Sequence, residues 1–408
     1  MPINRSALWL GIANVLLAGS AGAADIVVDD AGDAGQPAGC TLRDAILSAN
    51  ADQAVGNCSP GLGVDTLTIT VQPVNDAPIV FTDDPPVIET PIEIRGNSLT
   101  TTTIDFGGHG GFRIDDGDPQ VSIDVLLEGL TLQNATGQLG GAIDNAESLT
   151  IEDVTLTGNT ASFGGGIASR GSLVMSNSTV SGNTAERGGG MLFTEAATVT
   201  ISVSGINDNV ATDGGAGGIE VFDGDVTLLD STVMRNTAAS GGGGLELTNA
   251  TATVKGSMLS ENVVVDGAGR GGGILGRNVT ISVADSTISD NVLDGEQSQG
   301  GGVYLESGSL TVLDASIISG NAAVRAGGGI HAGATVTITV DASEISGNRA
   351  SIGGGWYAQA EGTLTDSTIS GNTAELNGGG VYLRGGSFKV NSGALASNSA
   401  FGGAGGGI

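Results

Sequence analysis

The chain has 408 residues, of which 72 are Gly, and 44 acidic residues outnumber 14 Lys and Arg to give a net charge of −30. A surface this acidic repels the phosphates of nucleic acids and of anionic lipids, so the charge argues against both as partners. The Gly residues show no Gly-X-Y period, which excludes collagen, and plentiful Val, Ile and Leu argue against disorder. With collagen and disorder set aside, so much Gly is best explained by an array of internal repeats.

Residues 1–23 have the composition of a secretory signal peptide. One Arg precedes an apolar run over residues 7–18, and residues 21–23 read Ala-Gly-Ala, a typical cleavage motif. The apolar run is too short for a transmembrane helix, which needs about 20 residues. We therefore expect cleavage after Ala23, export to the outer surface or the medium, and a mature chain without a transmembrane helix. Because residues 1–23 carry one Arg and no acid, the mature net charge is −31.

Residues 24–61 are expected to form an N-terminal cap. They contain the two cysteines of the chain, Cys40 and Cys58, which lie 18 positions apart. In an oxidising compartment such an isolated pair favours a disulfide. A metal site is disfavoured because the two histidines, His109 and His331, lie far from the cysteines in the sequence. No metal ligand is assigned.

A short helix is expected within this cap, over residues 41–51. Thr41 is a suitable N-terminal capping residue, and apolar side chains at helical spacing would share one face. Tied down by the disulfide, such a helix would cover the open end of a repeat array, where unpaired strand edges invite aggregation. The apolar residues on this face are Leu42, Ala45, Ile46 and Ala49.

Residues 62–135 contain less regular strand patterns, among them TLTIT, IVFT, IEIRG and TTTIDF, and are interpreted as early, imperfect turns. Within them, residues 109–120 concentrate charged side chains that suit an acid/base or calcium site. An Asp-Asp-Gly-Asp run is more often an exposed turn, because these residues accept its backbone angles. The charged residues of this segment are His109, Arg113, Asp115, Asp116 and Asp118.

Two columns of residues recur every 24–30 positions or so through residues 136–408. One is an apolar residue directly after a Gly cluster, and the other is an Asn that follows an aliphatic residue by three positions. Short alternating strands lie between them. The pattern predicts a solenoid with three short strands per turn, each strand hydrogen-bonded to its equivalents about 4.8 Å away in adjacent turns.

The repeated Gly and Asn residues are interpreted as structural. Gly permits positive φ at a tight corner, and Asn tolerates the left-handed region and can stack in an amide ladder along the rod. The asparagines of this predicted ladder are Asn159, Asn183, Asn209, Asn236, Asn262, Asn291, Asn321, Asn348, Asn372 and Asn398.

The segment GCTLRDAILSAN at residues 39–50 and the alternation of GGGI with SGNTA resemble a known family, the secreted bacterial right-handed parallel β-helix proteins. Those proteins begin with a Cys-Ser-Leu-Arg-Glu-Ala-type segment, in which Thr41 and Asp44 here replace Ser and Glu. The repeats are also similar to those of polymorphic outer-membrane proteins, whose passengers are displayed at the cell surface. The resemblance covers essentially the whole mature chain. It implies an all-β, right-handed parallel β-helix and export, and no particular activity.

The residue after each inward apolar residue is expected to point outward. In the C-terminal turns this outward column contains Tyr304, His331, Tyr357 and Tyr382, with Arg384 beside them. Their ring faces would suit an extended glycan or peptide. Alternatively, aromatic side chains on neighbouring strands support one another by roughly 0.2–1 kcal/mol per pair.

Glu220 and Glu246 are neighbours in the same column, in successive turns. Two carboxylates about 5 Å apart are typical of retaining glycosidases, and such a pair can also bind calcium weakly. Any two acids stacked in a parallel sheet acquire this separation, so the pair has little diagnostic value. No catalytic residue and no cofactor are assigned from the sequence.

These observations favour an exported, non-enzymatic β-helix protein, adhesin-like or passenger-like, that contacts glycans or neighbouring cells. The alternative is a polysaccharide lyase or glycoside hydrolase. It is weaker because Arg170, Arg277 and Arg384 are too widely spaced to form a basic stripe for an acidic polymer. The final residues, GGAGGGI, open another turn, so we expect either continuation into an anchor or barrel or a partner that covers Ile408.

Overall fold

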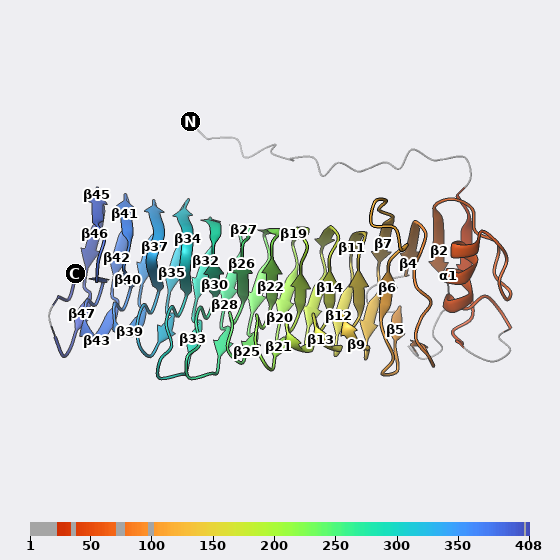
Figure 1. Cartoon of the computed structure of the whole chain (residues 1–408), viewed down its shortest axis with the longest axis horizontal. Helices are drawn as coiled ribbons and strands as arrows, with labels where there is room; N and C mark the ends of the chain where they lie inside the picture. The colour runs from red at the N-terminus through yellow and green to blue at the C-terminus, as the bar shows by residue number, and fades with distance from the viewer. Residues whose placement is uncertain (1–22, 34–37, 71–77, 97–101, 404) are drawn as a thin grey trace, which may run out of the picture.

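In the computed structural model the chain forms a long rod, with the helix α1 (Leu42–Ala51) near one end and the last strands at the other (Figure 1). The predicted signal peptide lies outside the described residues except for its last residue. The structure describes residues 23–33, 38–70, 78–96, 102–403 and 405–408.

The strands of the described part of the chain form three parallel sheets of 23, 13 and 11 strands along the rod. The first sheet has two columns of strands. The first column contains β6 (Phe112–Ile114), β10 (Ile143–Asn145), β14 (Ile167–Ser169), β18 (Met191–Phe193), β22 (Ile219–Phe222), β26 (Leu245–Thr248), β30 (Ile274–Arg277), β34 (Val303–Leu313), β37 (Ile330–Asp341), β40 (Trp356–Ala358) and β44 (Val381–Leu383). The second contains β1 (Asp25–Val28), β2 (Asp65–Ile69), β4 (Ile92–Arg95), β7 (Asp124–Glu128), β11 (Ser148–Glu152), β15 (Leu173–Ser176), β19 (Thr198–Ser202), β23 (Asp225–Leu229), β27 (Thr251–Lys255), β31 (Val279–Ala284), β41 (Glu361–Thr365) and β45 (Phe388–Asn391).

The other two sheets each have one strand per turn. The second sheet contains β3 (Ile79–Val80), β5 (Thr103–Asp105), β8 (Thr131–Gln133), β12 (Thr155–Thr157), β16 (Thr179–Ser181), β20 (Gly205–Asn207), β24 (Thr232–Met234), β28 (Met258–Ser260), β32 (Thr287–Ser289), β35 (Ile317–Ser319), β38 (Glu344–Ser346), β42 (Thr368–Ser370) and β46 (Ala394–Ala396). The third contains β9 (Thr136–Leu139), β13 (Thr160–Phe163), β17 (Thr184–Arg187), β21 (Val210–Ala211), β25 (Thr237–Ala238), β29 (Val263–Val264), β33 (Val292–Leu293), β36 (Ala322–Ala323), β39 (Arg349–Ile352), β43 (Thr373–Asn377) and β47 (Ser399–Ala400).

This arrangement confirms the predicted parallel β-helix and shows how one turn is built. The three sheets are the three predicted faces, but a regular turn has four strand segments, such as β10 to β13. The additional segment arises because the first face is divided between β10 and β11. In β34 and β37 one long strand runs through both columns instead.

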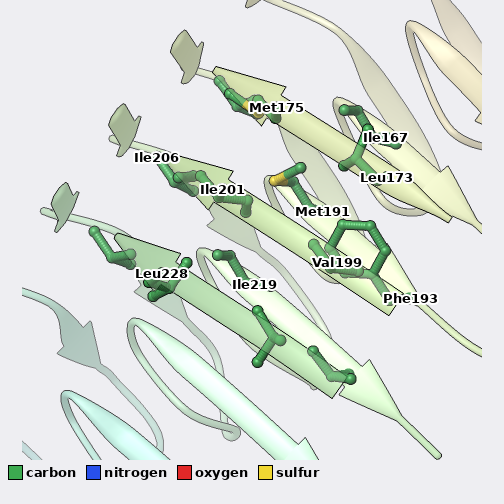
Figure 2. Close-up of a cluster of buried hydrophobic side chains, with 14 of the residues drawn as sticks. Ile167, Leu173, Met175, Met191, Phe193, Val199, Ile201, Ile206, Ile219 and Leu228 are labelled. Atoms are coloured by element: carbon green, nitrogen blue, oxygen red, sulfur yellow. The ribbon is translucent and has the colours of Figure 1, made fainter. Parts of the chain in front are cut away.

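The core lies inside the stacked turns and consists of aliphatic side chains in rows. Figure 2 shows Ile167, Met191 and Ile219 in successive turns, flanked by Leu173 and Val199 from the second strand column. The first three side chains are fully buried. Burial of a side chain of this size stabilises the fold by roughly 1.5–3 kcal/mol, so each turn contributes through its inward residues.

The Gly clusters have two distinct structural tasks. Gly164, the first residue of one cluster, has a φ of +66°, and a Cβ there would lie 2.2 Å from the carbonyl oxygen of Ile167. Gly165 approaches the next turn, where a Cβ would lie 2.2 Å from the carbonyl oxygen of Gly189. The first Gly therefore makes the corner, and the second lets adjacent turns stack closely.

The asparagines are linked in a hydrogen-bonded ladder along the rod. Asn183 Nδ2 donates to Asn209 Oδ1 at 3.0 Å, and the Asn183 backbone N–H donates to the same oxygen at 3.1 Å. Asn183 Nδ2 also donates to the carbonyl of Leu156 at 3.1 Å. The same bonds recur from Asn159 to Asn398. The ladder thus satisfies amide groups that would otherwise be buried without partners.

The left-handed residue at this corner is not the Asn but the residue before it. Gly182 has a φ of +64° and Asp208 a φ of +58° at equivalent positions. The ladder asparagines therefore do not use their tolerance for the left-handed conformation. Asn is required here for its amide group, and the preceding residue makes the turn.

A ladder of serines accompanies the asparagines and was not anticipated from the sequence. The backbone N–H of Ser178 donates to Ser204 Oγ, and that of Ser204 donates to Ser231 Oγ, both at 3.1 Å. Each serine lies five positions before a ladder Asn, a signal that the repeats do contain. The two ladders fix the register of adjacent turns at both ends of the second sheet.

The N-terminal end of the rod contains the short helix and the disulfide, and the apolar face of the helix joins the core. Thr41 Oγ1 accepts a hydrogen bond of 3.1 Å from the backbone N–H of Asp44, and a disulfide joins Cys40 to Cys58. One feature is additional: β1 pairs in parallel with β2 and so begins the first sheet immediately after the predicted cleavage site. The buried residues of α1 are Leu42, Ala45, Ile46, Ser48 and Ala49.

Candidate functional site

The residues after the inward apolar residues of the first strand column form one row along the rod, in the register that the repeats predict. We call this row the outward column. Its members are Arg113, Asp144, Ala168, Leu192, Glu220, Glu246, Leu275, Tyr304, His331, Tyr357 and Tyr382.

The outward column is not freely exposed, contrary to expectation. From Ala168 to Tyr357 its residues are at most 7 % exposed. They lie outside the apolar core cluster, and Ala168 and Leu192 among them line a cleft between the first and third sheets. The third sheet contributes Phe163 and Arg187 to the other wall, and its longer connections contribute Arg270.

The C-terminal part of the outward column is a continuous stack of rings. The ring centroids of Tyr304 and His331 are 4.8 Å apart, those of His331 and Tyr357 4.6 Å, and those of Tyr357 and Tyr382 5.4 Å. The interplanar angles are 15° or less. The guanidinium of Arg270 lies 5.0 Å from the Tyr304 centroid and closes the stack at that end.

This stacking uses the ring faces that a glycan would need. His331 contacts a tyrosine on each side, so neither face is open. Burial, together with the charges of Arg270 and Arg325, lowers the pKa of His331 to about 3, so the ring is neutral near pH 7. Only the end of the stack, at Tyr382 and Arg384, is substantially accessible. The geometry therefore favours mutual support between the rings.

Arg384 contacts the stack through a hydroxyl group. Its Nη1 donates to the Tyr357 Oη at 3.4 Å, and Gln359 Nε2 donates to the same oxygen at 3.4 Å. Arg384 thus holds the edge of a ring in place. The residues predicted to bind a ligand are brought together, but mainly as partners of one another.

Glu220 and Glu246 lie side by side in the middle of the outward column. Glu220 is paired with Arg187 of β17, and Glu246 with Arg277 of β30. Burial and, next, the charge of the neighbouring Glu246 raise the pKa of Glu220, Arg187 opposes them, and the result is a pKa of about 7. Glu220 is therefore partly protonated near neutral pH.

Calcium is poorly matched to this carboxylate pair. Arg187 and Arg277 already supply one positive charge for each glutamate, and Arg277 also contacts Glu306 at 3.4 Å. A divalent cation would be repelled by the guanidinium groups that now hold the carboxylates. Weak calcium binding at this pair has no support from its geometry.

An open cleft lies at the N-terminal part of the outward column, and we call it the early cleft. Its apolar part encloses about 330 Å³. Ala168 and Leu192 form its floor, with Phe163 and Phe222 on its sides and Arg187 at its rim. The guanidinium of Arg187 lies 5.1 Å from the Phe222 centroid. The small side chain of Ala168 leaves room for the cleft here.

The polar part of the early cleft adjoins the apolar part at Arg170 and Glu195, which line both. It encloses about 530 Å³ and is lined by four carboxylates and one guanidinium. The guanidinium of Arg170 lies 3.3 Å from the carboxylate of Asp144 and 3.9 Å from that of Asp115. Its positive charge is therefore compensated by these two carboxylates. The charged lining residues are Asp115, Asp118, Glu147, Arg170 and Glu195.

The charged segment at residues 109–120 does not form a single site. Asp115, Asp116 and Asp118 accept backbone hydrogen bonds two residues ahead, as in an exposed turn. His109 lies elsewhere, with ligand atoms of Asp83 and Asp84 within 4.8 Å. A cation at this group is disfavoured by Arg43, whose guanidinium donates to the carbonyls of both aspartates.

Sequence reasoning missed the early cleft because its lining comes from two separate strand columns and from connections between strands. Phe163 and Arg187 belong to the third sheet, and Ala168 and Leu192 to the first. A signal was present: Ala168 is the smallest member of an otherwise bulky outward column. None of the helices among the described residues is long and apolar enough to span a membrane.

The comparison with protein-family models agrees with this architecture. A family model described as the right handed beta helix region matches residues 120–287, 194–363 and 255–408. None of the curated proteins compared with the chain matches it in sequence. A similar solved structure is that of PfbA, a surface adhesin of Streptococcus pneumoniae, with 12% identity and a TM-score of 0.35 over 82% of this chain and 85% of that one. Because the family model covers more than half of the sequence, the chain belongs to the right-handed β-helix family.

Proposed function

We propose that this protein is an exported, non-enzymatic surface or extracellular protein that binds an extended protein segment in the early cleft. Export is supported by the predicted signal peptide and by the Cys40–Cys58 disulfide, since disulfides persist in oxidising compartments. The resemblance of the repeats to displayed passengers supports an adhesin-like or passenger-like role.

The single observation that carries the binding proposal is the early cleft itself. It joins an apolar hollow, lined by Phe163, Leu192 and Phe222, to a hollow lined by four carboxylates. This combination suits a segment in which an apolar side chain stands next to Lys or Arg. An acidic glycan would be repelled by the same carboxylates.

The test is binding of the mature chain to two arrays, one of peptides that vary in basic and apolar residues and one of neutral and acidic oligosaccharides. We expect binding to peptides that combine both residue types, and its loss in Ala168→Trp, which fills the apolar hollow. Tyr382→Ala is the matched control and should bind as the parent does. Absence of peptide binding, or binding that Ala168→Trp leaves intact, would overturn the proposal.

A second candidate function rests on Glu220. A buried carboxyl group with a pKa of about 7, next to a second carboxylate, has the acid/base character of a glycoside hydrolase. The test is to incubate the protein with extracellular polysaccharides and to measure new reducing ends and unsaturated products. Hydrolysis that Glu220→Gln abolishes would favour this enzyme over the binding protein.

A further inference from the structure

A buried carboxylate at the N-terminal end of the rod has no cationic partner among the residues that the structure describes. Asp65, the first residue of β2, is fully buried. Its Oδ1 accepts hydrogen bonds from the backbone N–H of Leu62 at 2.7 Å and of Ala24 at 3.3 Å. Its Oδ2 is buried without any hydrogen-bond partner among the described residues.

The surroundings of Asp65 do not favour a negative charge. Gly61 packs against Oδ2, and the C-terminal half of α1, at Ser48 and Ala49, lies directly beyond it. That end of a helix carries partial negative charge. Burial raises the pKa of Asp65, and the charge of Asp52 raises it further, against the lowering effect of the two backbone hydrogen bonds. No Arg, Lys or His of the described residues is ion-paired with Asp65.

The backbone of Ala24 is held directly beside this carboxylate. Its carbonyl accepts a hydrogen bond of 2.9 Å from the backbone N–H of Thr66, and Asp25 pairs with Thr66 in the parallel ladder of β1 and β2. The nitrogen of Ala24 is therefore fixed at 3.3 Å from Asp65 Oδ1. Ala24 is also the residue that follows the predicted cleavage motif, and Ala23 before it is exposed.

We propose that removal of the signal peptide between Ala23 and Ala24 creates the missing cation, so that the new α-ammonium of Ala24 forms a buried ion pair with Asp65. The inference rests on the export that is part of the proposed function. Hydrolysis by a signal peptidase breaks the C–N bond between Ala23 and Ala24 and consumes one water molecule. The products at neutral pH are a carboxylate on Ala23 and an ammonium on Ala24, so charge and atoms balance.

The chemistry of the nitrogen explains why cleavage matters. In the precursor Ala24 has one N–H, which reaches one oxygen of Asp65. The ammonium has three N–H groups and a positive charge, so it can satisfy both oxygens and compensate the buried charge. Processing would therefore strengthen the pairing of β1 with β2 and lock the cap only after export.

The test uses mature chains that begin at Ala24, with and without one added Gly before it, each with Asp65 or with Asp65→Asn. Hydrogen exchange of the β1 and β2 amides is the readout. With Asp65 present, the added Gly should lower protection about tenfold or more, because the ammonium moves away from its partner. In the Asp65→Asn chains the added Gly should change little. An equal effect in both backgrounds would overturn the proposal.

Two further measurements test the ion pair even if the Asp65→Asn chain fails to fold. Acetylation of Ala24 in the otherwise unchanged mature chain removes the charge and should lower protection as the added Gly does. The α-amino group of Ala24 should titrate above the ordinary range of about 7.7–8.0. An ordinary value, or full protection after acetylation, contradicts the ion pair.

The N-terminus of the exported protein tests the processing step separately. Sequencing should begin at Ala24, and any other start would overturn the claim that cleavage supplies the cation. Failure of the early cleft to bind peptides would leave both results unchanged, so the two proposals fail independently.

Discussion

The outward column has opposite roles in two regions of the same rod. Between Ala168 and Leu192 it forms the floor of an open cleft, whereas between Tyr304 and Tyr382 its rings stack on one another. The backbone is the same in both regions, since every member of the column is in parallel register with the next. The difference arises from side-chain size and, at Tyr304, from the connection that contains Arg270.

One long connection covers the stack at Tyr304. β13 ends at Phe163 and is followed at once by the corner residue Gly164. By contrast, residues 265–273 separate β29 from β30, and Arg270 in that connection lies over Tyr304. A solenoid can therefore open or close one face locally without any change in its core.

The largest effect expected from this comparison is the loss of a ring from the stack. His331→Ala should lower the free energy of unfolding by about 3 kcal/mol, because it leaves a cavity between two buried tyrosines. Urea denaturation measures this change, and peptide binding should be unaffected. A variant as stable as the parent would show that the stack is not structural.

The stability of the protein should depend on pH because of Glu220 in the middle of the outward column. The pKa of Glu220 is raised from 4.5 to about 7, so the folded state binds this proton more tightly than the unfolded state. The resulting stability is present below pH 4.5 and lost as the pH rises through about 7. This shift in the pKa of Glu220 corresponds to a change of about 3 kcal/mol at most in the free energy of unfolding.

Glu220→Gln is the matched variant for this prediction. Its unfolding free energy, compared with that of the parent between pH 4 and about 8, should lack this decline. Parallel curves for the two proteins would contradict the assigned burial of Glu220.

At the accessible end of the stack the cost of losing a ring should be smaller. Tyr382→Ala removes one stacking contact from a half-buried position, and we expect a loss of about 1 kcal/mol. The same urea experiment compares the stability lost in Tyr382→Ala with that lost in His331→Ala. A larger loss in His331→Ala shows that burial of the ring, and not stacking alone, stabilises the region. Equal losses would contradict the importance of burial.

The smallest change in stability is expected in the early cleft. Ala168→Trp places a large side chain in a hollow of about 330 Å³, so the unfolding free energy should change by less than about 0.5 kcal/mol. Thermal unfolding checks this value. A large loss would mean that the hollow cannot accept a side chain.

Most of the fold could be predicted from the sequence because its determinants repeat. The ladder from Asn159 to Asn398 and the inward residues such as Ile167 define the turn length and the register. The partners of the outward column could not be predicted in this way. Arg187 reaches Glu220 from the third sheet, and Arg270 reaches Tyr304 from a connection that has no counterpart in the shorter turns.

The proposed early cleft differs from the surface that the sequence suggested for a related physical reason. Aromatic residues in a column suggest a binding surface, but at strand spacing of about 4.8 Å their own faces are the nearest partners. A small residue such as Ala168 gives no recognisable binding motif in a sequence, although its small side chain leaves the cleft open. The surface that a solenoid offers to a ligand therefore depends on the small residues of a column as much as on its large residues.

The most direct test of this account compares peptide binding by the mature chain with binding by Ala168→Trp and Tyr382→Ala, measured by calorimetry with the best peptide from the array. The account predicts that Ala168→Trp abolishes binding while Tyr382→Ala retains the affinity of the parent. Retained binding in Ala168→Trp together with loss in Tyr382→Ala would place the site on the aromatic stack and contradict the assignment of the two regions.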